Sequence, residues 1–158
     1  MATEDDAIAI VPFLDAYAPA FERLSREWLE ALVRVEEKDL VYLRDPRATI
    51  VAPGGEVFFA IRAGAVVGAC AAIRRESGDI ELAKLGVAPE ARRRGVGRKL
   101  SEAVIAFARR ARAAKVVLTS NSRLVPALRL YESLGFRRAP PPRDLGYETA
   151  DVYLELTL

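Results

Sequence analysis

The chain has 158 residues, a length that suits one domain with its own hydrophobic core, and we expect residues 1–158 to form a single domain. Hydrophobic residues make up 51% of the chain, yet no apolar run approaches the ~20 residues that a membrane-spanning helix needs. The formal net charge of +2 is by itself too small to indicate binding to nucleic acid.

Hydrophobic periodicity divides the chain into strands and helices separated by Pro, Gly and Asp turn residues. Amphipathic spacing is clear near the amino terminus, where Phe21, Leu24 and Trp28 recur at helical intervals. In chain order we expect a strand at 7–11, helices at 19–33 and 36–43, strands at 56–62, 66–74 and 80–87, a helix at 96–112, a strand at 115–121, a helix at 126–134, and strands at 136–139 and 148–156 joined by the loop 140–147. This order predicts a mixed, mostly antiparallel sheet with helices on both faces.

The most informative segment is 85–100, which runs from a strand end through several arginines into a helix start. Gly95 and Gly97 leave backbone N–H groups uncovered by Cβ atoms, so an anionic group can approach the peptide plane. The helix that follows adds its positive dipole end and its unpaired amides. The segment therefore predicts a pyrophosphate-binding loop, surrounded by the cationic side chains of Arg92, Arg93, Arg94, Arg98 and Lys99.

Two nucleotide-binding loops with similar glycines do not fit this segment. A P-loop ends in Gly-Lys-Ser/Thr, whereas Gly97 is followed by Arg98, Lys99 and Leu100. The dinucleotide fingerprint needs a third glycine or alanine at position 100 and an acidic residue about 20 positions later. The stretch 115–120 contains no acidic residue, so both motifs are excluded.

Two motifs resemble the signatures of the GNAT superfamily of N-acetyltransferases. The pattern Arg92-x-x-Gly95-x-Gly97 resembles the acetyl-CoA signature of that superfamily, Gln/Arg-x-x-Gly-x-Gly/Ala. The string Asn121…Ala127-x-x-x-Tyr131-x-x-x-Gly135-Phe136 is similar to its second signature, in which the tyrosine lies beside the thioester sulfur. The two motifs occur in the family's order, each on a helix that follows a strand, and together they span residues 79–137.

The resemblance implies an α/β (α+β) fold, the GNAT fold, with about seven strands and a splay between the fourth and fifth strands. It also implies an acetyl-CoA-dependent N-acetyltransferase that uses acetyl-CoA as co-substrate and no metal. The acetyl group would pass directly to a primary amine of a small molecule or peptide in a ternary complex. The cofactor-binding residues that it implies are Leu85, Gly86 and Val87 along the pantetheine arm, and Arg92, Arg93, Arg94, Gly95, Val96, Gly97, Arg98, Lys99, Asn121 and Ala127.

The resemblance assigns the two proton transfers to Tyr131 and Glu81. Tyr131 is expected to protonate the departing sulfur while its ring packs against the sheet. Glu81 stands where histone-acetylating members carry their catalytic glutamate, and burial in a strand would raise its pKa toward that of a useful base. Alternation along the strand predicts that Glu81 shares one face with Leu85 and Val87, and that Lys84 faces the other way.

Other assignments of the base stay open on the sequence alone. Glu81 equally suits a solvated position at the start of a strand. Glu148 and Asp151 are the fallback candidates. A relay of water molecules without a single base is a further alternative.

Several polar and aromatic residues are candidates for contacts beyond these motifs. Asn121 is expected either to contact the cofactor or the acceptor, or to cap a turn. Leu124 stands where many family members place a cofactor-contacting asparagine, so that contact is not carried over. Trp28, Tyr42 and Tyr147 are candidates for an acceptor pocket, and Trp28 also suits the core.

The chain has no histidine and one cysteine. The lack of histidine excludes Ser-His-Asp and Cys-His hydrolase arrangements and removes the commonest zinc ligand, so we expect no metal site. Cys70 lies in an apolar segment of small residues and suits a buried hydrophobe better than a nucleophile. A single cysteine excludes an internal disulfide and fits a reducing cytoplasm, and the acidic segment 1–6 does not match a secretory or transit signal.

Two other function classes compete with the enzyme. A non-catalytic CoA-binding or sensor module would keep the anion-binding loop without needing Tyr131 and Glu81, both of which are present. A nucleic-acid-binding domain using the arginines at 92–98 and 109–112 would need a larger positive excess, with aromatic residues among them. We therefore expect acetyl-CoA and a small amine as partners, with no nucleic acid and no membrane, and a homodimer left open. The identity of the amine does not follow from the residues.

Overall fold

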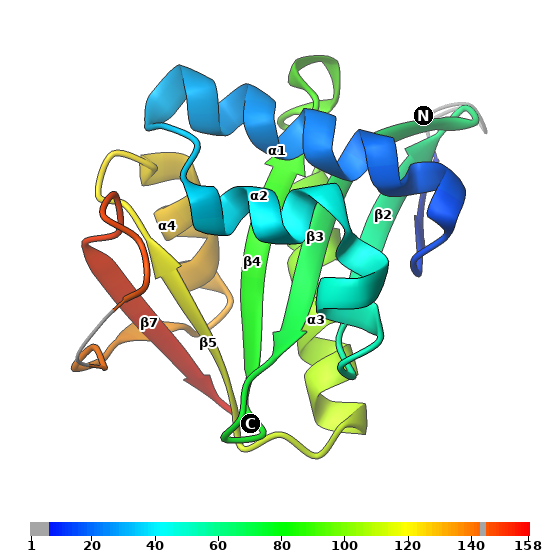
Figure 1. Ribbon diagram of the computed structural model, residues 1–158. Helices are drawn as coiled ribbons and strands as arrows, with labels where there is room; N and C mark the ends of the chain where they lie inside the picture. The colour runs from blue at the N-terminus through cyan, green and yellow to red at the C-terminus, as the bar shows by residue number, and fades with distance from the viewer. Residues whose placement is uncertain (1–6, 143–144) are drawn as a thin grey trace.

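The computed structural model describes residues 7–142 and 145–158, and its strands form one sheet (Figure 1). Expectations for the acidic segment 1–6 and for positions 143–144 of the loop 140–147 lie outside the described residues. The elements in chain order are β1 (Ile8–Val11), α1 (Ala18–Leu32), α2 (Glu37–Arg44), β2 (Glu56–Arg62), β3 (Ala65–Arg74), β4 (Ile80–Val87), α3 (Val96–Arg110), β5 (Lys115–Ser120), α4 (Val125–Ser133), β6 (Arg137–Arg138) and β7 (Val152–Thr157).

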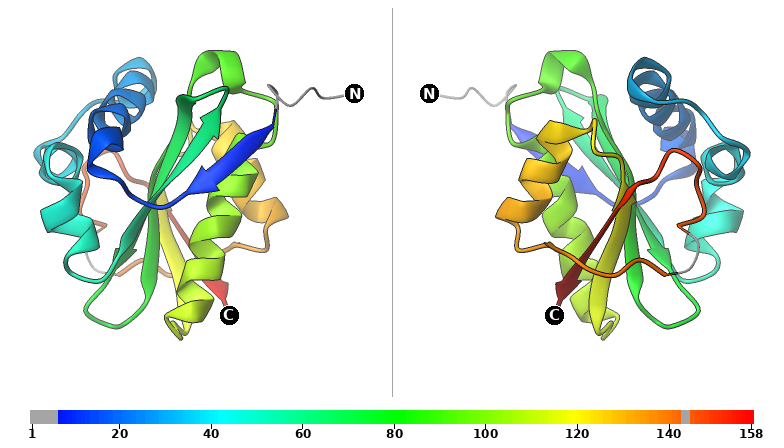
Figure 2. Two further views of the ribbon diagram at one scale, coloured as in Figure 1. Left: turned by 90° about the vertical axis from the view of Figure 1, so that its right-hand side faces the viewer. Right: turned by 90° about the vertical axis from the view of Figure 1, so that its left-hand side faces the viewer.

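The sheet has seven strands in the order β1-β2-β3-β4-β5-β7-β6. Every neighbouring pair is antiparallel except β4 and β5, which are parallel. Figure 2 shows α1 and α2 on one face of the sheet and α3 and α4 on the other. The expected mixed, mostly antiparallel sheet with helices on both faces is confirmed.

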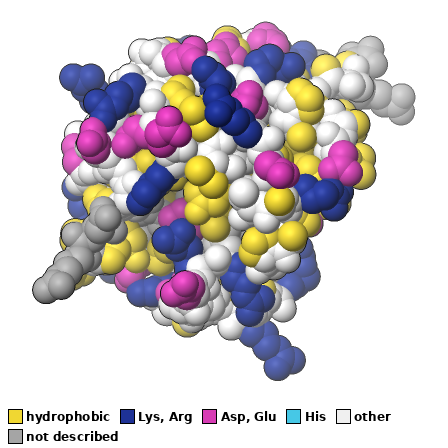
Figure 3. All heavy atoms as spheres, in the orientation of Figure 1, with side chains coloured by type: hydrophobic (Ala, Val, Ile, Leu, Met, Phe, Trp, Pro, Cys, Tyr) yellow, Lys and Arg dark blue, Asp and Glu magenta, His cyan; other side chains and the backbone are white. Residues whose placement is uncertain are grey.

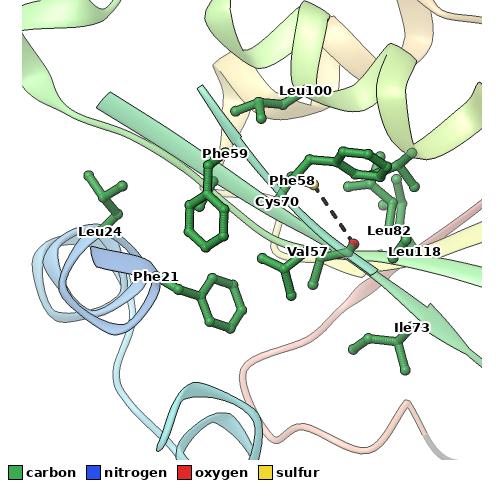
Figure 4. Close-up of a cluster of buried hydrophobic side chains, with 14 of the residues drawn as sticks. Phe21, Leu24, Val57, Phe58, Phe59, Cys70, Ile73, Leu82, Leu100 and Leu118 are labelled. Atoms are coloured by element: carbon green, nitrogen blue, oxygen red, sulfur yellow. Dashed lines mark hydrogen bonds between the residues drawn. The ribbon is translucent and has the colours of Figure 1, made fainter. Parts of the chain in front are cut away.

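Successive side chains of the central strands point to opposite faces of the sheet, so each strand packs against helices on both faces. On one face, Phe21 of α1 is fully buried and its ring points toward Phe59 of β2 (Figure 4), and Leu24 of the same helix is almost fully buried. On the other face, Phe58 packs edge-on against Phe107 of α3, with ring centroids 6.3 Å apart. The core therefore lies on both sides of β2, β3 and β4.

The sheet splays between β4 and β5. Their parallel register comprises only two pairs, Ile80 with Val116 and Glu81 with Val117. Figure 1 shows the two strands close together at this end and diverging toward the other end of β4. The splay expected from the family resemblance is therefore present, and it leaves the far half of β4 without a partner on that side.

A β-bulge interrupts β4 at the point where the strands diverge. Ala69 of β3 pairs with Gly86, whereas Ala71 pairs with Ala83, so two residues of β4 oppose one residue of β3. One of the two is Lys84, whose φ of +56° is a left-handed conformation that residues other than glycine seldom adopt. The extra residue shifts the alternation of side chains along the strand.

The structure differs from the expected elements at several points. The last strand begins at Val152 rather than at 148, because the carboxylate of Glu36 accepts the backbone N–H groups of Glu148 and Thr149, at 2.9 and 3.2 Å. A π-helical turn at Arg47–Val51 was not expected. The helix expected at 96–112 ends at Arg110, and the residues that it buries are Val96, Leu100, Ser101, Val104 and Ala108. No helix in the described ranges is both long and apolar enough to cross a membrane.

Candidate active site

A cleft of about 750 Å³ lies where β4 and β5 diverge, and this volume is typical of small-molecule sites. Its walls come from both sides of the sheet: α1, α2 and the turn at 147–150 on one side, and the start of α3 and the body of α4 on the other. Most of the predicted site residues meet here, and only Arg94 and Lys99 among them are not part of its lining. The predicted residues that line the cleft are Glu81, Leu85, Gly86, Val87, Arg92, Arg93, Gly95, Val96, Gly97, Arg98, Asn121, Ala127 and Tyr131.

One end of the cleft is formed by the start of α3. Gly95 precedes the helix in the left-handed conformation, with φ of +78°, which lets the arginine loop turn sharply into the helix. Within the described residues no side chain caps α3, and its first-turn N–H groups have no acceptor inside the helix. These amides and the helix dipole make this end suitable for an anion.

The arginines beside this helix start are held by neighbouring groups. The Nε of Arg92 donates to the backbone carbonyl of Val87, at 3.4 Å. Arg98 donates to the hydroxyl of Ser133 in α4 and lies 3.9 Å from Glu102. Arg92 and Arg98 both line the cleft, and these hydrogen bonds to β4 and α4 hold their guanidinium groups in place. The anion-binding end therefore carries positive charge in a fixed position.

The two glycines of the loop have different structural roles. A Cβ atom at Gly97 would lie 3.3 Å from Cδ2 of Leu130 and 3.8 Å from Cδ2 of Leu85, so glycine here allows α3 to pack closely against α4. A Cβ atom at Gly95 would meet no atom within 4 Å, and glycine there serves the positive φ. The expectation that both positions serve mainly to uncover amides is therefore incomplete, because Gly97 also permits helix packing.

Tyr131 forms part of the α4 wall and is only 6% exposed. Its ring packs edge-on against Phe136, with centroids 5.8 Å apart. Its hydroxyl has no hydrogen-bond partner among the described residues. Burial, with a smaller contribution from Cys70, raises the pKa of Tyr131, so the phenol keeps its proton at neutral pH.

Glu81 does not lie on the face that alternation predicted. Paired residues of antiparallel strands share a face, and Val87 pairs with Gly68, where an added Cβ would meet side chains of α3. Glu81 pairs with Ile73, which lies on the opposite face of β3 because it is an odd number of positions from Gly68. Glu81 therefore faces α1 and α2, while Val87 faces α3. The prediction of a shared face is wrong because the bulge at Lys84 shifts the alternation by one residue.

Lys84 was expected to face away from Glu81, and this is also wrong. Its ammonium pairs with the carboxylate of Asp39 in α2, and the two side chains are only 7% and 3% exposed. The same ammonium lies 3.4 Å from the hydroxyl of Tyr147 and 4.7 Å from the centre of that ring. Lys84, Asp39 and Tyr147 thus form a buried cluster on the Glu81 side of the cleft.

The carboxyl group of Glu81 is largely removed from water, with 12% of its side chain exposed. Burial raises the pKa of Glu81, whereas Arg75, at 3.9 Å, and Lys84 act in the lowering direction. The alternative of a solvated residue at the strand start does not match this burial. A buried carboxyl with a raised pKa that lines the cleft has the properties of a general base.

The fallback bases have other contacts. Glu148 is exposed and pairs with Arg34. Asp151 accepts the N–H and the hydroxyl of Ser122 at 2.8 and 2.7 Å, and these hydrogen bonds hold its pKa below the usual value. Neither carboxylate is part of the cleft lining. Glu81 is therefore better placed than either to meet an acceptor in the cleft.

Asn121 lines the cleft but uses its side chain to hold the backbone. Its Nδ2 donates to the carbonyl of Thr149, and its Oδ1 accepts the N–H of Arg123 at 2.8 Å. These bonds match the turn-capping alternative for this residue. Of the aromatic candidates for an acceptor pocket, Trp28 and Tyr147 line the cleft and Tyr42 does not.

Other chemistries have little support in the structure. In the described ranges there is no group of three or more His, Cys, Asp or Glu side chains that could hold a metal ion. Cys70 is fully buried with its Sγ 3.6 Å from the carbonyl of Ala83, and burial raises the pKa of its thiol. On the face shown in Figure 3, cationic and anionic side chains are interspersed rather than gathered into one basic surface.

Comparison with known proteins agrees with this geometry. The family model described as an acetyltransferase (GNAT) domain matches residues 53–138. An N-acetylaspartate synthetase from Danio rerio is 36% identical over 104 residues, which are 65% of this chain and 37% of that protein, so the chain matches about a third of its relative's length.

Solved structures share the fold over almost the whole chain. A GNAT-family acetyltransferase from Staphylococcus aureus Mu50 has a TM-score of 0.86 at 19% identity, covering 96% of this chain and 99% of that one. A Salmonella typhimurium protein solved with its cofactor acetyl-CoA has a TM-score of 0.75 at 20% identity, covering 96% and 94%. Together with the family match, which includes both sequence motifs and the splayed strands, this likeness leads to one conclusion: the chain belongs to the GNAT acetyltransferase domain family.

Proposed function

We propose that the protein is an acetyl-CoA-dependent N-acetyltransferase that acetylates a primary amine. The observation that carries this proposal is the cleft between β4 and β5, which has an anion-binding helix start at one end and two buried proton-transfer groups on opposite sides of the sheet. Family membership supports the reaction. The name of the Danio rerio relative, an N-acetylaspartate synthetase, adds support for an amino group as the acceptor.

The residues present fit acetyl-CoA, which when bound supplies an acetyl group activated as a thioester. Its diphosphate suits the uncapped first turn of α3 together with the guanidinium groups of Arg92, Arg93 and Arg98. The unpaired edge of β4 from Leu85 to Val87 offers backbone groups for the amide-bearing pantetheine arm. These roles complete the cofactor-binding proposal for the cleft.

Glu81 and Tyr131 then divide the proton transfers between them. The acceptor arrives as an ammonium ion, and Glu81 accepts one proton from it so that the nitrogen lone pair can attack the thioester carbon. A C–N bond forms and the C–S bond breaks, and Tyr131 gives its hydroxyl proton to the leaving sulfur. The second proton lost by the nitrogen restores the phenol, so one proton per turnover leaves the site through Glu81.

The two groups suit these roles because their pKa values are raised by burial for different purposes. A raised pKa lets Glu81 hold the proton of an ammonium ion more firmly than an exposed carboxylate can. A raised pKa keeps Tyr131 protonated until negative charge develops on the sulfur. Because Glu81 and Tyr131 lie on opposite faces of the sheet, the group that activates the acceptor and the group that protonates the leaving thiol approach the reaction from different sides.

A screen of acceptors tests the proposed function. Amines, amino acids, aminoglycosides and peptides are incubated with acetyl-CoA and the full chain, while free thiol is followed and products are identified by mass spectrometry. We expect at least one acceptor to raise thiol release above hydrolysis and to appear as its N-acetyl derivative. Tight binding of acetyl-CoA without acceptor-dependent release would instead favour the non-catalytic CoA-binding module.

A further inference from the structure

The Glu81 side of the cleft has apolar walls. Trp28, Leu29 and Leu32 of α1 line it together with Val33, which directly follows the helix, and Tyr147 is also part of its lining. Leu32 is 48% exposed although it is a large hydrophobic residue at the end of its helix. A bound apolar group would cover this surface and gain free energy by removing it from water. We call this region the acceptor end.

Lys84 is the cation among the described residues that line the acceptor end, and its charge is already compensated. The Lys84 ammonium pairs with Asp39, and the pair is almost completely buried. The hydroxyl and ring of Tyr147 take up a second side of the same ammonium. The remaining titratable group that lines the acceptor end among the described residues is Glu81, so Lys84, Asp39 and Glu81 together carry one negative charge when the carboxyl of Glu81 is ionised.

The other cations of the cleft belong to its opposite end. Arg92 and Arg93 come from the loop before α3, and Arg98 reaches Ser133 of α4. Arg75 approaches Glu81 at 3.9 Å, but it is not part of the cleft lining, and it partly offsets the charge of Glu81 from outside. Among the residues that the structure describes, a ligand at the acceptor end therefore meets a carboxyl group and apolar walls without an uncompensated cation.

This charge pattern discriminates between amines that carry a carboxylate and amines that do not. A ligand carboxylate at the acceptor end would lose its hydration without gaining a cation of its own, and it would be repelled by Glu81. A ligand ammonium would instead gain a charge-assisted hydrogen bond to the carboxylate of Glu81.

We infer that the acceptor is a small primary amine with an apolar body and without a carboxylate next to its amino group. This inference rests on the proposed function, because it names the substrate class of the same cleft. It differs from what the Danio rerio relative's name indicates for that protein, which is an acidic amino acid. Asp39 is the residue that sets the preference, because its carboxylate occupies the ammonium that an amino acid would otherwise use.

Direct binding measurements test the inference without relying on turnover. Trp28 is the only tryptophan of the chain and lines the acceptor end, so its fluorescence under selective tryptophan excitation reports occupancy there. Phenethylamine and phenylalanine share one aromatic body and differ by a carboxylate, and each is titrated into the full chain saturated with CoA. We expect phenethylamine to bind at least about tenfold more tightly, a difference of about 1.4 kcal/mol.

A matched pair of variants isolates the cause. Asp39→Asn frees the Lys84 ammonium while its side-chain oxygen can still accept the N–H of Glu36, so the preference for phenethylamine should shrink at least about threefold. Asp15→Asn removes an exposed carboxylate that pairs with Arg47, and it should leave the preference unchanged. If Asp39→Asn does not fold, the comparison of the two ligands on the parent chain still decides the question.

The outcomes separate this inference from the proposed function. Equal or tighter binding of phenylalanine, or no binding of phenethylamine, overturns the acceptor class. Acetylation of aspartate or phenylalanine in preference to phenethylamine also overturns it, while the proposed transferase function stands. Tight binding of phenethylamine without its acetylation supports the acceptor class and counts against the transferase function.

Discussion

Tyr131→Phe is the sharpest test of the chemistry because the change removes one oxygen atom and little else. The ring is 6% exposed and packs against Phe136 at a centroid distance of 5.8 Å, and phenylalanine retains that packing. The hydroxyl has no hydrogen-bond partner among the described residues, so its loss should change the free energy of unfolding by less than about 1 kcal/mol. The melting temperature and the affinity for CoA should therefore stay close to those of the parent.

The effect on turnover should be much larger than the effect on stability. A missing general acid leaves the sulfur to depart as a thiolate, and we expect single-turnover thiol release to slow roughly 10- to 1,000-fold. This corresponds to about 1.4–4.1 kcal/mol of lost transition-state stabilisation. Tyr153→Phe is the matched control, because its hydroxyl bonds to Glu155 at 3.1 Å and Tyr153 is not part of the cleft lining.

The measurement is a single-turnover assay with enzyme in excess over acetyl-CoA and saturating amine, with thiol release followed in real time. Single-turnover rates are needed because slow product release can conceal a slower chemical step. A Tyr131→Phe enzyme with parental single-turnover rates would refute the assignment, and water would then be the proton donor. A loss of the same size in Tyr153→Phe would show that removal of a hydroxyl acts through the fold.

Four further predictions concern other parts of the cleft. Glu81→Gln should lower turnover at neutral pH roughly 100-fold with little change in acetyl-CoA affinity, and an unchanged pH–rate profile would mean that the base lies elsewhere. The raised pKa of Glu81 also predicts that the parent loses stability as the pH rises from about 4.5 through that raised value, because the folded protein holds a proton that the unfolded chain has already released. Urea unfolding at a series of pH values should show a weaker pH dependence of the unfolding free energy in Glu81→Gln. Gly97→Val should abolish the binding of CoA measured by calorimetry. It should also lower the free energy of unfolding by about 1–3 kcal/mol, because Leu130 must move away from the added atoms. Unchanged CoA binding would contradict the role of this helix start. Lys84→Met should lower the free energy of unfolding by about 3–5 kcal/mol, because it leaves the buried carboxylate of Asp39 unpaired. Glu155→Gln changes a pair whose side chains are 35% and 26% exposed, and it should cost less than about 1 kcal/mol. Equal losses in the two variants would show that the Lys84 pair is not effectively buried.

The sequence predicts strand boundaries correctly where turn residues stand directly before the strand. The expected strands at 56–62 and 80–87 coincide with β2 and β4, because Gly54 and Gly55 precede one and the Ser77-Gly78-Asp79 turn precedes the other. Side-chain direction within β4 did not follow, since the bulge places a lysine at positive φ. Glycine or asparagine at this position would have indicated the left-handed conformation, whereas a lysine such as Lys84 gives no such indication.

The parts of the site that sequence reasoning found are the parts that are local in the chain. Contiguous sequence motifs predict the arginine–glycine loop and the helix that carries Tyr131, and both segments line the cleft. The pairing of Lys84 with Asp39 joins residues 45 positions apart, and no spacing rule connects them. Glu36 similarly takes two backbone amides more than a hundred positions away and thereby delays the start of β7.

We expect the cleft between β4 and β5 to bind acetyl-CoA with its thioester between Tyr131 and Glu81. A crystal structure of the full chain with CoA measures this directly. We expect electron density for the diphosphate against the first-turn amides of α3, for the pantetheine arm along Leu85–Val87, and for the sulfur on the Tyr131 side of the cleft. Density for CoA elsewhere on the protein, or a diphosphate bound away from the start of α3, would contradict it.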